Sequence, residues 1–180
     1  MLRAFMHFKH FSPILFIVVS ASCVSSGSPE TEKISKTFTV NKNDSFQSTN
    51  FHIQFLNQVN LARSEGRHCG QRFFPAAPQL SLNNVLNHAA YNHSNDMFEH
   101  QFLDHASSNG DTLVERMSSV DYSWRAVGEN IAHNQNSIGQ VIEDWLSSPG
   151  HCSNIMSADY TQTGVAQVNR YWTQVYATPK

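Results

Sequence analysis

Hydrophobic residues recur with helical spacing in two long stretches of the first half of the chain. Between Phe51 and Gly66 an apolar side chain returns every third position, and residues 48–50 supply side chains that cap helices. The clearest pattern covers residues 82–97, where apolar positions fall at i, i+3, i+4, i+7 and i+8. We therefore predict one helix that begins near Phe51 and a second helix with Ser81 as its N-cap.

The second half of the chain carries one strong helical pattern and one weak one. Residues 137–148 place apolar side chains on one face, and Pro149-Gly150 ends the pattern, so we predict a helix there. A shorter helix is predicted over residues 112–117, with Asp111 as its N-cap. Residues 100–111 are predicted to form a loop.

Two β-prone runs, residues 164–168 and 171–176, lie near the end of the chain and are separated by Asn169-Arg170. Such runs around a two-residue turn are typical of an antiparallel hairpin. Residues 67–78 are predicted to form a loop, and the aromatic, glycine-containing stretch at 120–133 is assigned no helix or strand. Helices together with a few antiparallel strands indicate an α+β domain.

The start of the chain has the organisation of a secretory signal. Arg3 and Lys9 precede an apolar stretch over residues 11–19, and small residues follow it. The apolar stretch is too short for a membrane span, which needs about 20 residues. We therefore expect residues 1–22 to be removed as a signal peptide and the protein to be exported.

Cys23 follows directly, and the segment Val-Ser-Ala-Ser-Cys is similar to a bacterial lipobox. We expect Cys23 to carry a lipid anchor, with the protein facing the periplasm at the outer membrane or lying on the cell surface. The alternative is ordinary cleavage nearby, which leaves a soluble protein with one spare thiol. Residues 23–50 have no usable period and are predicted to form a flexible tether. Lysine is absent from Phe51 to Pro179, which places the start of the domain near residue 50.

The two remaining cysteines are expected to form a disulfide. If Cys23 is acylated, Cys69 and Cys152 are an even pair in an oxidising compartment, where disulfides persist. Closing a loop of roughly 80 residues contributes about 4 kcal/mol in the chain-entropy model. The competing interpretation is a zinc ion held by His68-Cys69 and His151-Cys152, but adjacent residues rarely direct their side chains at one metal.

Charge excludes one class of partner. The 180 residues include 12 Lys plus Arg and 14 Asp plus Glu, so the formal net charge is only −2. A protein that binds nucleic acid needs a clearly basic surface, and this composition does not supply one. Charged residues make up 14% of the chain, against the usual quarter, so its polarity depends mainly on Asn, Ser, Gln and His.

Seven motifs occur in an order that resembles a known family. They are Asn60-Leu-Ala-Arg63, Ala77-Pro-Gln-Leu80, the helix at 82–97, Phe102-Leu-Asp-His105, Gly128-Glu-Asn-Ile-Ala132, residues 145–156 and Tyr171-Trp-Thr-Gln174. With these motifs, residues 51–178 resemble the CAP superfamily of cysteine-rich secretory, antigen 5 and plant pathogenesis-related proteins, also called SCP domains. The bacterial branch is the most similar. The resemblance implies a three-layer α-β-α sandwich with a small antiparallel sheet and a shallow cleft where His and Glu side chains gather.

The family pattern implies five cleft positions in this chain. They are His105, Glu129, His151, Tyr171 and Gln174. Eukaryotic members place a second glutamate and a further histidine where this chain has Ser148 and Tyr171. We expect His151 to replace the lost imidazole, whereas nothing obvious replaces the lost carboxylate.

Two neutral imidazoles and a carboxylate form a ligand set suited to zinc. His105 and His151, with Glu129, are therefore the candidate metal ligands, and a divalent metal such as zinc is the cofactor that they suggest. The alternative is that each of the three is a satisfied structural residue.

Several other polar and aromatic residues are interpreted as structural. His93 lies on the apolar stripe of the helix at 82–97 and is expected to be buried by packing. Glu115-Arg116 is expected to form a solvated face, although Glu115 lies near enough to His105 in sequence to support it. Three large aromatic residues are expected in the core: Trp145, Trp172 and Tyr176.

These observations favour an exported, lipid-anchored binding module of the bacterial envelope rather than an enzyme. Its expected ligand is a lipid or sterol-like molecule, or another envelope component, held in the His/Glu cleft. A second hypothesis is a metal-dependent, peptidase-like hydrolase that uses His105 and His151 as ligands and Glu129 as base or ligand. A third is a structural surface protein with a vestigial cleft.

Overall fold

The computed structural model describes residues 42–180, and it describes side chains from residue 49 onward. The predicted signal peptide at 1–22, the lipidation of Cys23 and the tether up to residue 41 fall outside the described residues. The helices are α1 (Lys42–Arg63), α2 (Asn84–His100), α3 (Leu113–Ser119), α4 (Ile138–Ser147) and α5 (Pro149–Met156). The strands are β1 (Arg67–Cys69), β2 (Arg72–Phe74), β3 (Ser81–Leu82), β4 (Trp124–His133), β5 (Gln162–Val168) and β6 (Tyr171–Pro179).

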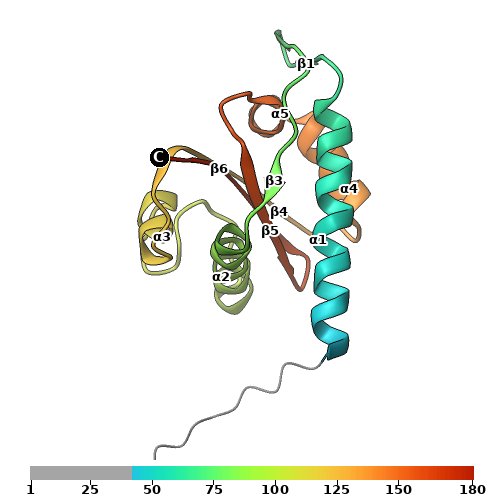
Figure 1. Ribbon diagram of the computed structural model, residues 1–180. Helices are drawn as coiled ribbons and strands as arrows, with labels where there is room; N and C mark the ends of the chain where they lie inside the picture. The colour runs from blue at the N-terminus through green and yellow to red at the C-terminus, as the bar shows by residue number, and fades with distance from the viewer. Residues whose placement is uncertain (1–41) are drawn as a thin grey trace, which may run out of the picture. The chain divides into compact units, whose positions relative to one another are not determined.

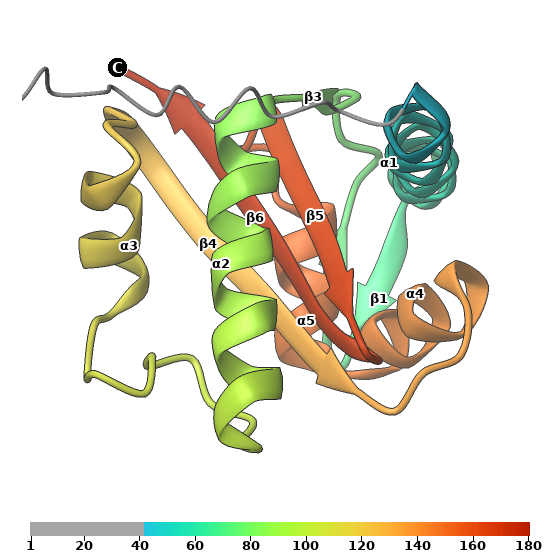
Figure 2. The ribbon, with the colours of Figure 1, turned by 90° about the horizontal axis from the view of Figure 1, so that it is seen from below.

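A four-stranded sheet forms the middle of three layers (Figure 1). Its strands follow the order β3-β5-β6-β4, and β6 pairs antiparallel with both of its neighbours. Helices α2 and α3 cover one face, whereas α1, α4 and α5 cover the other, as Figure 2 shows from a second direction. The predicted α+β class and three-layer sandwich are confirmed. The short edge strand β3 runs parallel to β5, so the sheet is not entirely antiparallel.

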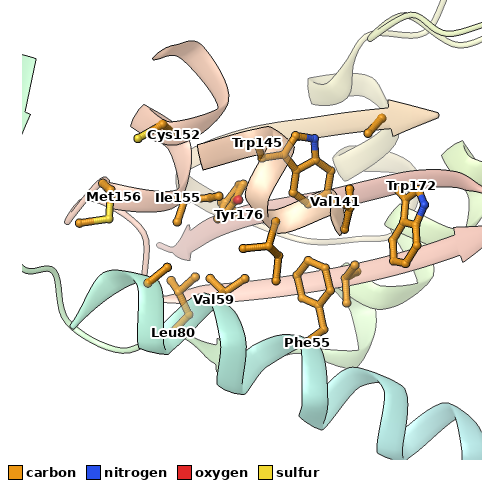
Figure 3. Close-up of a cluster of buried hydrophobic side chains, with 14 of the residues drawn as sticks. Phe55, Val59, Leu80, Val141, Trp145, Cys152, Ile155, Met156, Trp172 and Tyr176 are labelled. Carbon is orange, nitrogen blue, oxygen red and sulfur yellow. The ribbon is translucent and has the colours of Figure 1, made fainter. Parts of the chain in front are cut away.

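The larger core lies between the sheet and the layer of α1, α4 and α5 (Figure 3). Phe55 and Val59 of α1 are completely buried there, and Trp145 of α4 donates its indole N–H to the Ile131 carbonyl oxygen at 3.0 Å. Complete burial of such an apolar side chain contributes about 1.5–3 kcal/mol. The core prediction for the three large aromatic residues is confirmed, since each is at most 3% exposed: Trp145, Trp172 and Tyr176.

The predicted disulfide is present. Cys69 of β1 and Cys152 of α5 are bonded, with their Cα atoms 5.4 Å apart and a sequence separation of 83. The alternative zinc site is wrong because both sulfur atoms are used in this bond. The bond joins the β1–β2 hairpin to α5, and a loop of this length contributes about 4–5 kcal/mol in the chain-entropy model.

The first two helices begin at positions that differ from the prediction. α1 begins at Lys42 rather than near Phe51, so residues 42–50 are helical and not part of a flexible tether. These residues include neither glycine nor proline, and extending an existing helix costs far less than starting one. α2 is capped by Asn83, whose side chain accepts two main-chain N–H bonds, because Ser81 belongs to β3 and pairs with β5.

The cap of α3 also differs from the prediction by one residue. Thr112, not Asp111, is the N-cap, and it forms a capping box in which Glu115 bonds back to the main-chain N–H of Thr112. The strong helix predicted at 137–148 is confirmed as α4, with Ser137 as its N-cap.

Two segments that sequence patterns assigned to loops or helix ends have regular structure. Pro149-Gly150 ends α4 as predicted but also begins α5, because proline is compatible with the first position of a helix. Residues 67–74, predicted as part of a loop, form the antiparallel β1–β2 hairpin. The disulfide between Cys69 and Cys152 holds both segments. Local sequence patterns do not reveal this tertiary constraint.

β4 is the longest strand and was not predicted. The order of polar and apolar residues along β4 differs from that of a half-exposed strand. The positions from Glu129 to Ala132 are all buried, and polar residues do not alternate with apolar ones. Position 128 in this strand requires glycine, because a Cβ there would lie 2.3 Å from the hydroxyl oxygen of Tyr160. The predicted C-terminal hairpin is confirmed as β5 and β6, with positive φ at both residues of the Asn169-Arg170 turn.

We predict that Gly164 is required for the contact between α2 and β5. A Cβ at this position would lie 2.1 Å from the carbonyl carbon of Leu86 and 2.2 Å from the nitrogen of Asn87, both main-chain atoms of α2. Gly164→Ala should therefore lower the free energy of unfolding by about 3 kcal/mol, because α2 must move away from the sheet. Urea unfolding measures the change.

Gly150→Ala is the matched control for that variant. Nothing lies within 4 Å of a Cβ at Gly150, and alanine favours the helix, so stability should stay the same or rise slightly. An unchanged stability for Gly164→Ala would contradict the close packing of α2 on β5.

Candidate functional site

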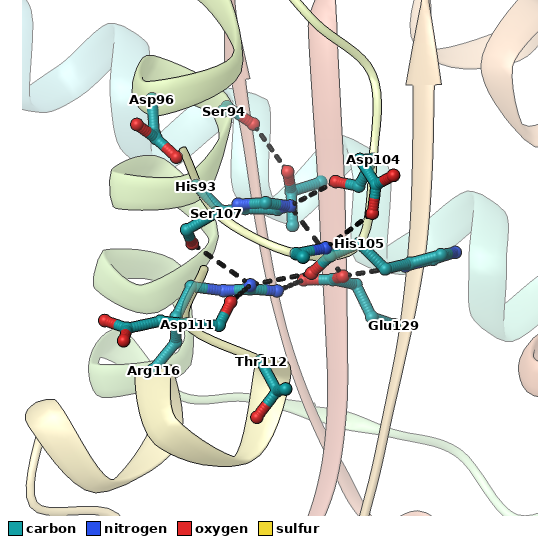
Figure 4. A network of polar contacts seen from close by, with 12 residues as sticks. His93, Ser94, Asp96, Asp104, His105, Ser107, Asp111, Thr112, Arg116 and Glu129 are labelled. Atoms are coloured by element: carbon teal, nitrogen blue, oxygen red, sulfur yellow. Dashed lines mark hydrogen bonds and ion pairs between the residues drawn. The ribbon is translucent and has the colours of Figure 1, made fainter. Parts of the chain in front are cut away.

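A buried carboxylate on β4 is the centre of the candidate site (Figure 4). The Glu129 side chain is only 2% exposed, and each of its oxygens has a charged or polar partner. His105 Nδ1 donates to Oε1 at 2.9 Å, and Arg116 Nη2 donates to Oε2 at 2.6 Å. Because the acceptor is a carboxylate, the proton of His105 is assigned to Nδ1. The predicted proximity of His105 and Glu129 therefore holds in the structure.

Arg116 connects the loop after α2 to this carboxylate. Besides Glu129, its guanidinium donates to the carbonyl oxygens of His105 at 2.8 Å and Asp111 at 3.2 Å, and to Ser107 Oγ at 3.2 Å. Breaking a buried ion pair by removing one partner costs about 3–5 kcal/mol, so the loss of either Arg116 or Glu129 would destabilise the fold. Arg116 thus holds the main chain of the loop while it neutralises Glu129.

The prediction of a solvated Glu115-Arg116 face is confirmed for Glu115, which is exposed, and wrong for Arg116. Arg116 is 7% exposed, and it lies on the same side of α3 as the apolar residues Leu113 and Met117. Glu115 caps α3 and does not contact His105. The one sequence signal for a buried Arg116 was its spacing from those apolar neighbours.

His93 of α2 holds the loop that carries His105. The ring is completely buried, as predicted, and Nε2 donates to the Asp104 carbonyl oxygen at 3.0 Å. Nε2 also lies 3.9 Å from Glu129 Oε1, whereas Nδ1 has no hydrogen-bond partner among the described residues. Burial lowers the pKa of His93, so the neutral ring is favoured. Hydrogen bonds from His93 and Arg116 therefore fix the main chain on either side of the His105 ring.

His105 itself presents its ring to solvent. Its side chain is 58% exposed, and the bond to Glu129 occupies Nδ1, which leaves Nε2 for a ligand. The hydrogen bond to Glu129 raises the pKa of His105 above its ordinary value of 6.5, because the carboxylate stabilises the imidazolium. The site therefore combines a rigid, buried base with an exposed, readily protonated imidazole.

His151 lies on the first turn of α5, close to the same site. Burial lowers the pKa of His151, and the charge on His105 lowers it further, so the two imidazoles are within electrostatic reach. Its ring packs near Trp145, with 6.4 Å between centroids. Asn130 donates to the His151 carbonyl oxygen at 3.1 Å.

Two asparagines attach α5 to β4 beside the site. Asn154 donates to the Glu129 carbonyl oxygen at 3.0 Å and to Asn130 Oδ1 at 2.9 Å. Asn130 is completely buried and also donates to the Tyr176 hydroxyl at 3.0 Å. These bonds hold the main chain of Glu129 and of His151 in one arrangement.

Tyr171 and Gln174 do not line a cleft, and both predictions need correction. Gln174 is completely buried, donates to Thr163 Oγ1 at 3.1 Å and accepts from the Tyr176 hydroxyl at 2.6 Å. Tyr171 is 5% exposed and stacks on His133 with 3.8 Å between centroids. Both lie on β6, which has a strand on each side and helices over both faces, so their side chains belong to the interior.

Glu129 is not free to act as a metal ligand, whereas the metal role predicted for His105 and His151 stays a prediction. Within residues 49–180, no three His, Cys, Asp or Glu side chains are arranged to hold a metal ion. The Glu129 oxygens are already bonded to His105 and Arg116, and the guanidinium adds a positive charge where a cation would have to approach. His105, Glu129 and His151 therefore do not fit a three-ligand metal centre.

Comparison with known proteins agrees with this architecture. Residues 56–176 match the model of the CAP family, described as the cysteine-rich secretory protein family. The chain belongs to this family. Two curated relatives from Bacillus subtilis are the uncharacterized membrane protein YlbC, 35% identical over 85 residues, and the uncharacterized protein YkwD, 32% identical over 99 residues. The matches cover 47% and 54% of this CAP protein, but only 25% and 38% of those relatives.

Solved structures share the CAP fold. An extracellular protein containing an SCP domain from Bacillus anthracis has a TM-score of 0.65 and 25% identity, and the match covers 77% of this chain and 44% of that one. An outer surface protein from Borrelia burgdorferi has a TM-score of 0.58 and 14% identity, with coverage of 78% and 97%. The second likeness concerns the fold alone.

We predict that His105 and His151 titrate on opposite sides of pH 6.5. Nuclear magnetic resonance of the imidazole protons should give a raised pKa for His105 and a lowered one for His151. In Glu129→Gln the pKa of His105 should fall, because its largest cause, the bond to the carboxylate, is removed. The pKa of His151 should stay low, because burial is the main cause there. An unchanged His105 titration in Glu129→Gln would refute the pairing.

The same shifts set the pH dependence of folding. The pKa of His105 is raised in the folded protein. Its contribution to the free energy of unfolding is therefore complete below pH 6.5 and is lost as pH rises through the pKa of the folded state. His93 acts in the opposite sense, because its folded pKa is lowered and stability is lost as pH falls below 6.5.

Proposed function

We propose that this CAP protein is an exported binding module of the bacterial envelope whose cleft holds an amphiphilic ligand at His105. The carrying observation is an exposed imidazole fixed by a buried carboxylate and a buried guanidinium. A folded domain needs no solvent-facing imidazole on such a rigid support, whereas a binding site benefits from a preorganised polar group.

The charges of the site favour a ligand with an acidic or hydrogen-bond-accepting head. Arg116 and Glu129 neutralise one another, so protonation of His105 leaves one positive charge at the surface. Leu103, two residues earlier, is 51% exposed and offers an apolar contact beside that charge. A lipid-like molecule with a polar head satisfies both features.

Binding is favoured over hydrolysis. Among the described side chains, no serine or threonine hydroxyl bonds to either cleft imidazole, and both cysteines of the domain are in the disulfide. The carboxylate that would have served a hydrolytic metal is paired with Arg116. The cleft therefore has the polar groups of a binding site without a partnered nucleophile.

Export and anchoring are part of the same proposal. The names of the related proteins describe an extracellular protein, an outer surface protein and a membrane protein. The part of this chain that the structure describes includes no helix long and apolar enough to cross a membrane. A lipid on Cys23 would supply the attachment, and the residues before the domain would act as its tether.

We expect the mature protein to begin with a lipid-modified Cys23. Mass spectrometry of the full chain purified from bacterial membranes should find a modified N-terminal cysteine, and Cys23→Ser should instead accumulate with intact residues 1–22 or in soluble form. An unmodified mature chain that begins at another residue would exclude the anchor while leaving the cleft proposal intact.

We expect oleate, a carboxylate with an apolar tail, to bind the full chain more weakly after His105→Ala. A hydrogen bond to a charged group contributes about 1.5–3 kcal/mol, which corresponds to roughly a 10- to 100-fold loss of affinity. Isothermal titration calorimetry measures the loss. Methyl oleate, which accepts a hydrogen bond but lacks the charge, should lose less affinity than oleate.

His100→Ala is the matched control for this experiment. His100 is also exposed, at 59%, and pairs with a carboxylate, Asp96, at 3.0 Å, but it lies at the end of α2. Oleate affinity should not change in this variant. Equal binding of oleate to wild type and His105→Ala would reject the cleft as the site.

A further inference from the structure

A groove lies between α2 and the segment formed by α3 and its flanking loops, the pair of helices in Figure 2. It consists of two cavities of about 440 Å³ and 250 Å³, and both cavities have Asn92 and Ser119 in their walls. The larger is within the volume range of small-molecule sites. Neither is lined by His105, Glu129 or His151, although Arg116, which bonds to Glu129, lines the smaller cavity.

One stripe of α2 forms a continuous wall of this groove. Its residues recur every fourth position, which keeps them on one side of the helix over about 18 Å. They are Asn84, His88, Asn92 and Asp96. The groove is therefore long enough for an extended ligand.

Two of the four polar side chains of this wall, those of His88 and Asn92, are available to a ligand. Among the described residues, the side chains of His88 and Asn92 have no hydrogen-bond partner. An amide such as that of Asn92 both donates and accepts, and a neutral imidazole does the same through its two nitrogens. These are the partners that a vicinal pair of hydroxyl groups requires.

Apolar surface accompanies these polar groups. Val85 and Val120 line the larger cavity, and Val85 is 39% exposed. These two valine side chains offer apolar surface to the C–H faces of a sugar ring.

The charges narrow the class of ligand. Asp96 and Asp121 bring carboxylates to the groove, which disfavours an anion, and the nearby guanidinium of Arg116 is paired with Glu129. The amide and imidazole wall disfavours an entirely apolar molecule, because its polar groups would lose water without gaining partners.

We propose that the groove between α2 and α3 binds a neutral oligosaccharide. Its hydroxyls pair with Asn92, His88 and the carboxylate of Asp121, while its C–H faces rest on Val85 and Val120. This site is additional to the amphiphile cleft and stands without it.

The test uses the full chain with two probes, the tetramer of N-acetylglucosamine and maltotetraose. Nuclear magnetic resonance titration up to about 10 mM probe should shift the amide signals of the residues that line the groove, for at least one probe. Asn92→Leu should weaken that binding about tenfold, because it removes a paired donor and acceptor. His88→Leu, a second change in the wall of the groove, should weaken it as well.

Asn95→Leu is the matched control, because Asn95 lies on the same helix but does not line either cavity. Its affinity should equal that of wild type, and so should that of His105→Ala, which separates this site from the cleft. No shift in the groove with either probe, or equal losses in Asn92→Leu and Asn95→Leu, would overturn the proposal.

Discussion

A carboxylate inside a protein must be paired, and the pairing of Glu129 determines the arrangement around it. Its two oxygens are bonded to Arg116 of α3 and His105 of the loop after α2, so one strand residue connects three segments. The same guanidinium binds two carbonyl oxygens of that loop. The loop is thereby attached to β4 and α3, and the bond to Glu129 fixes the exposed imidazole of His105.

The other side of the site is held by neutral hydrogen bonds. Asn154 and Asn130 connect α5 to β4, and the disulfide attaches the same helix to the β1–β2 hairpin. α5 is a short helix whose N-cap residue makes no side-chain cap bond, so its place depends on these tertiary contacts. The place of His151 therefore depends on how α5 is packed, whereas His105 is held by a direct hydrogen bond to Glu129.

Long apolar patterns and turn chemistry were predictable because they depend on neighbours in sequence. The helices at residues 82–97 and 137–148 and the C-terminal hairpin were identified this way, and cysteine parity identified the disulfide. β4 was missed because a strand buried on both sides lacks alternation. Arg116 was misjudged because a charged residue on a short helix is usually solvated, and the carboxylate that buries it lies thirteen positions away.

The sequence by itself determined the α+β class, the main helices, the cysteine pairing and the family resemblance with its pair His105 and Glu129. Only the tertiary structure decided that Gln174 and Tyr171 are interior residues, that His93 supports the loop and that Arg116 occupies the carboxylate. The reason is physical. Local patterns report which side chains avoid water, whereas the partner of a buried charge is chosen by packing between segments distant in the chain.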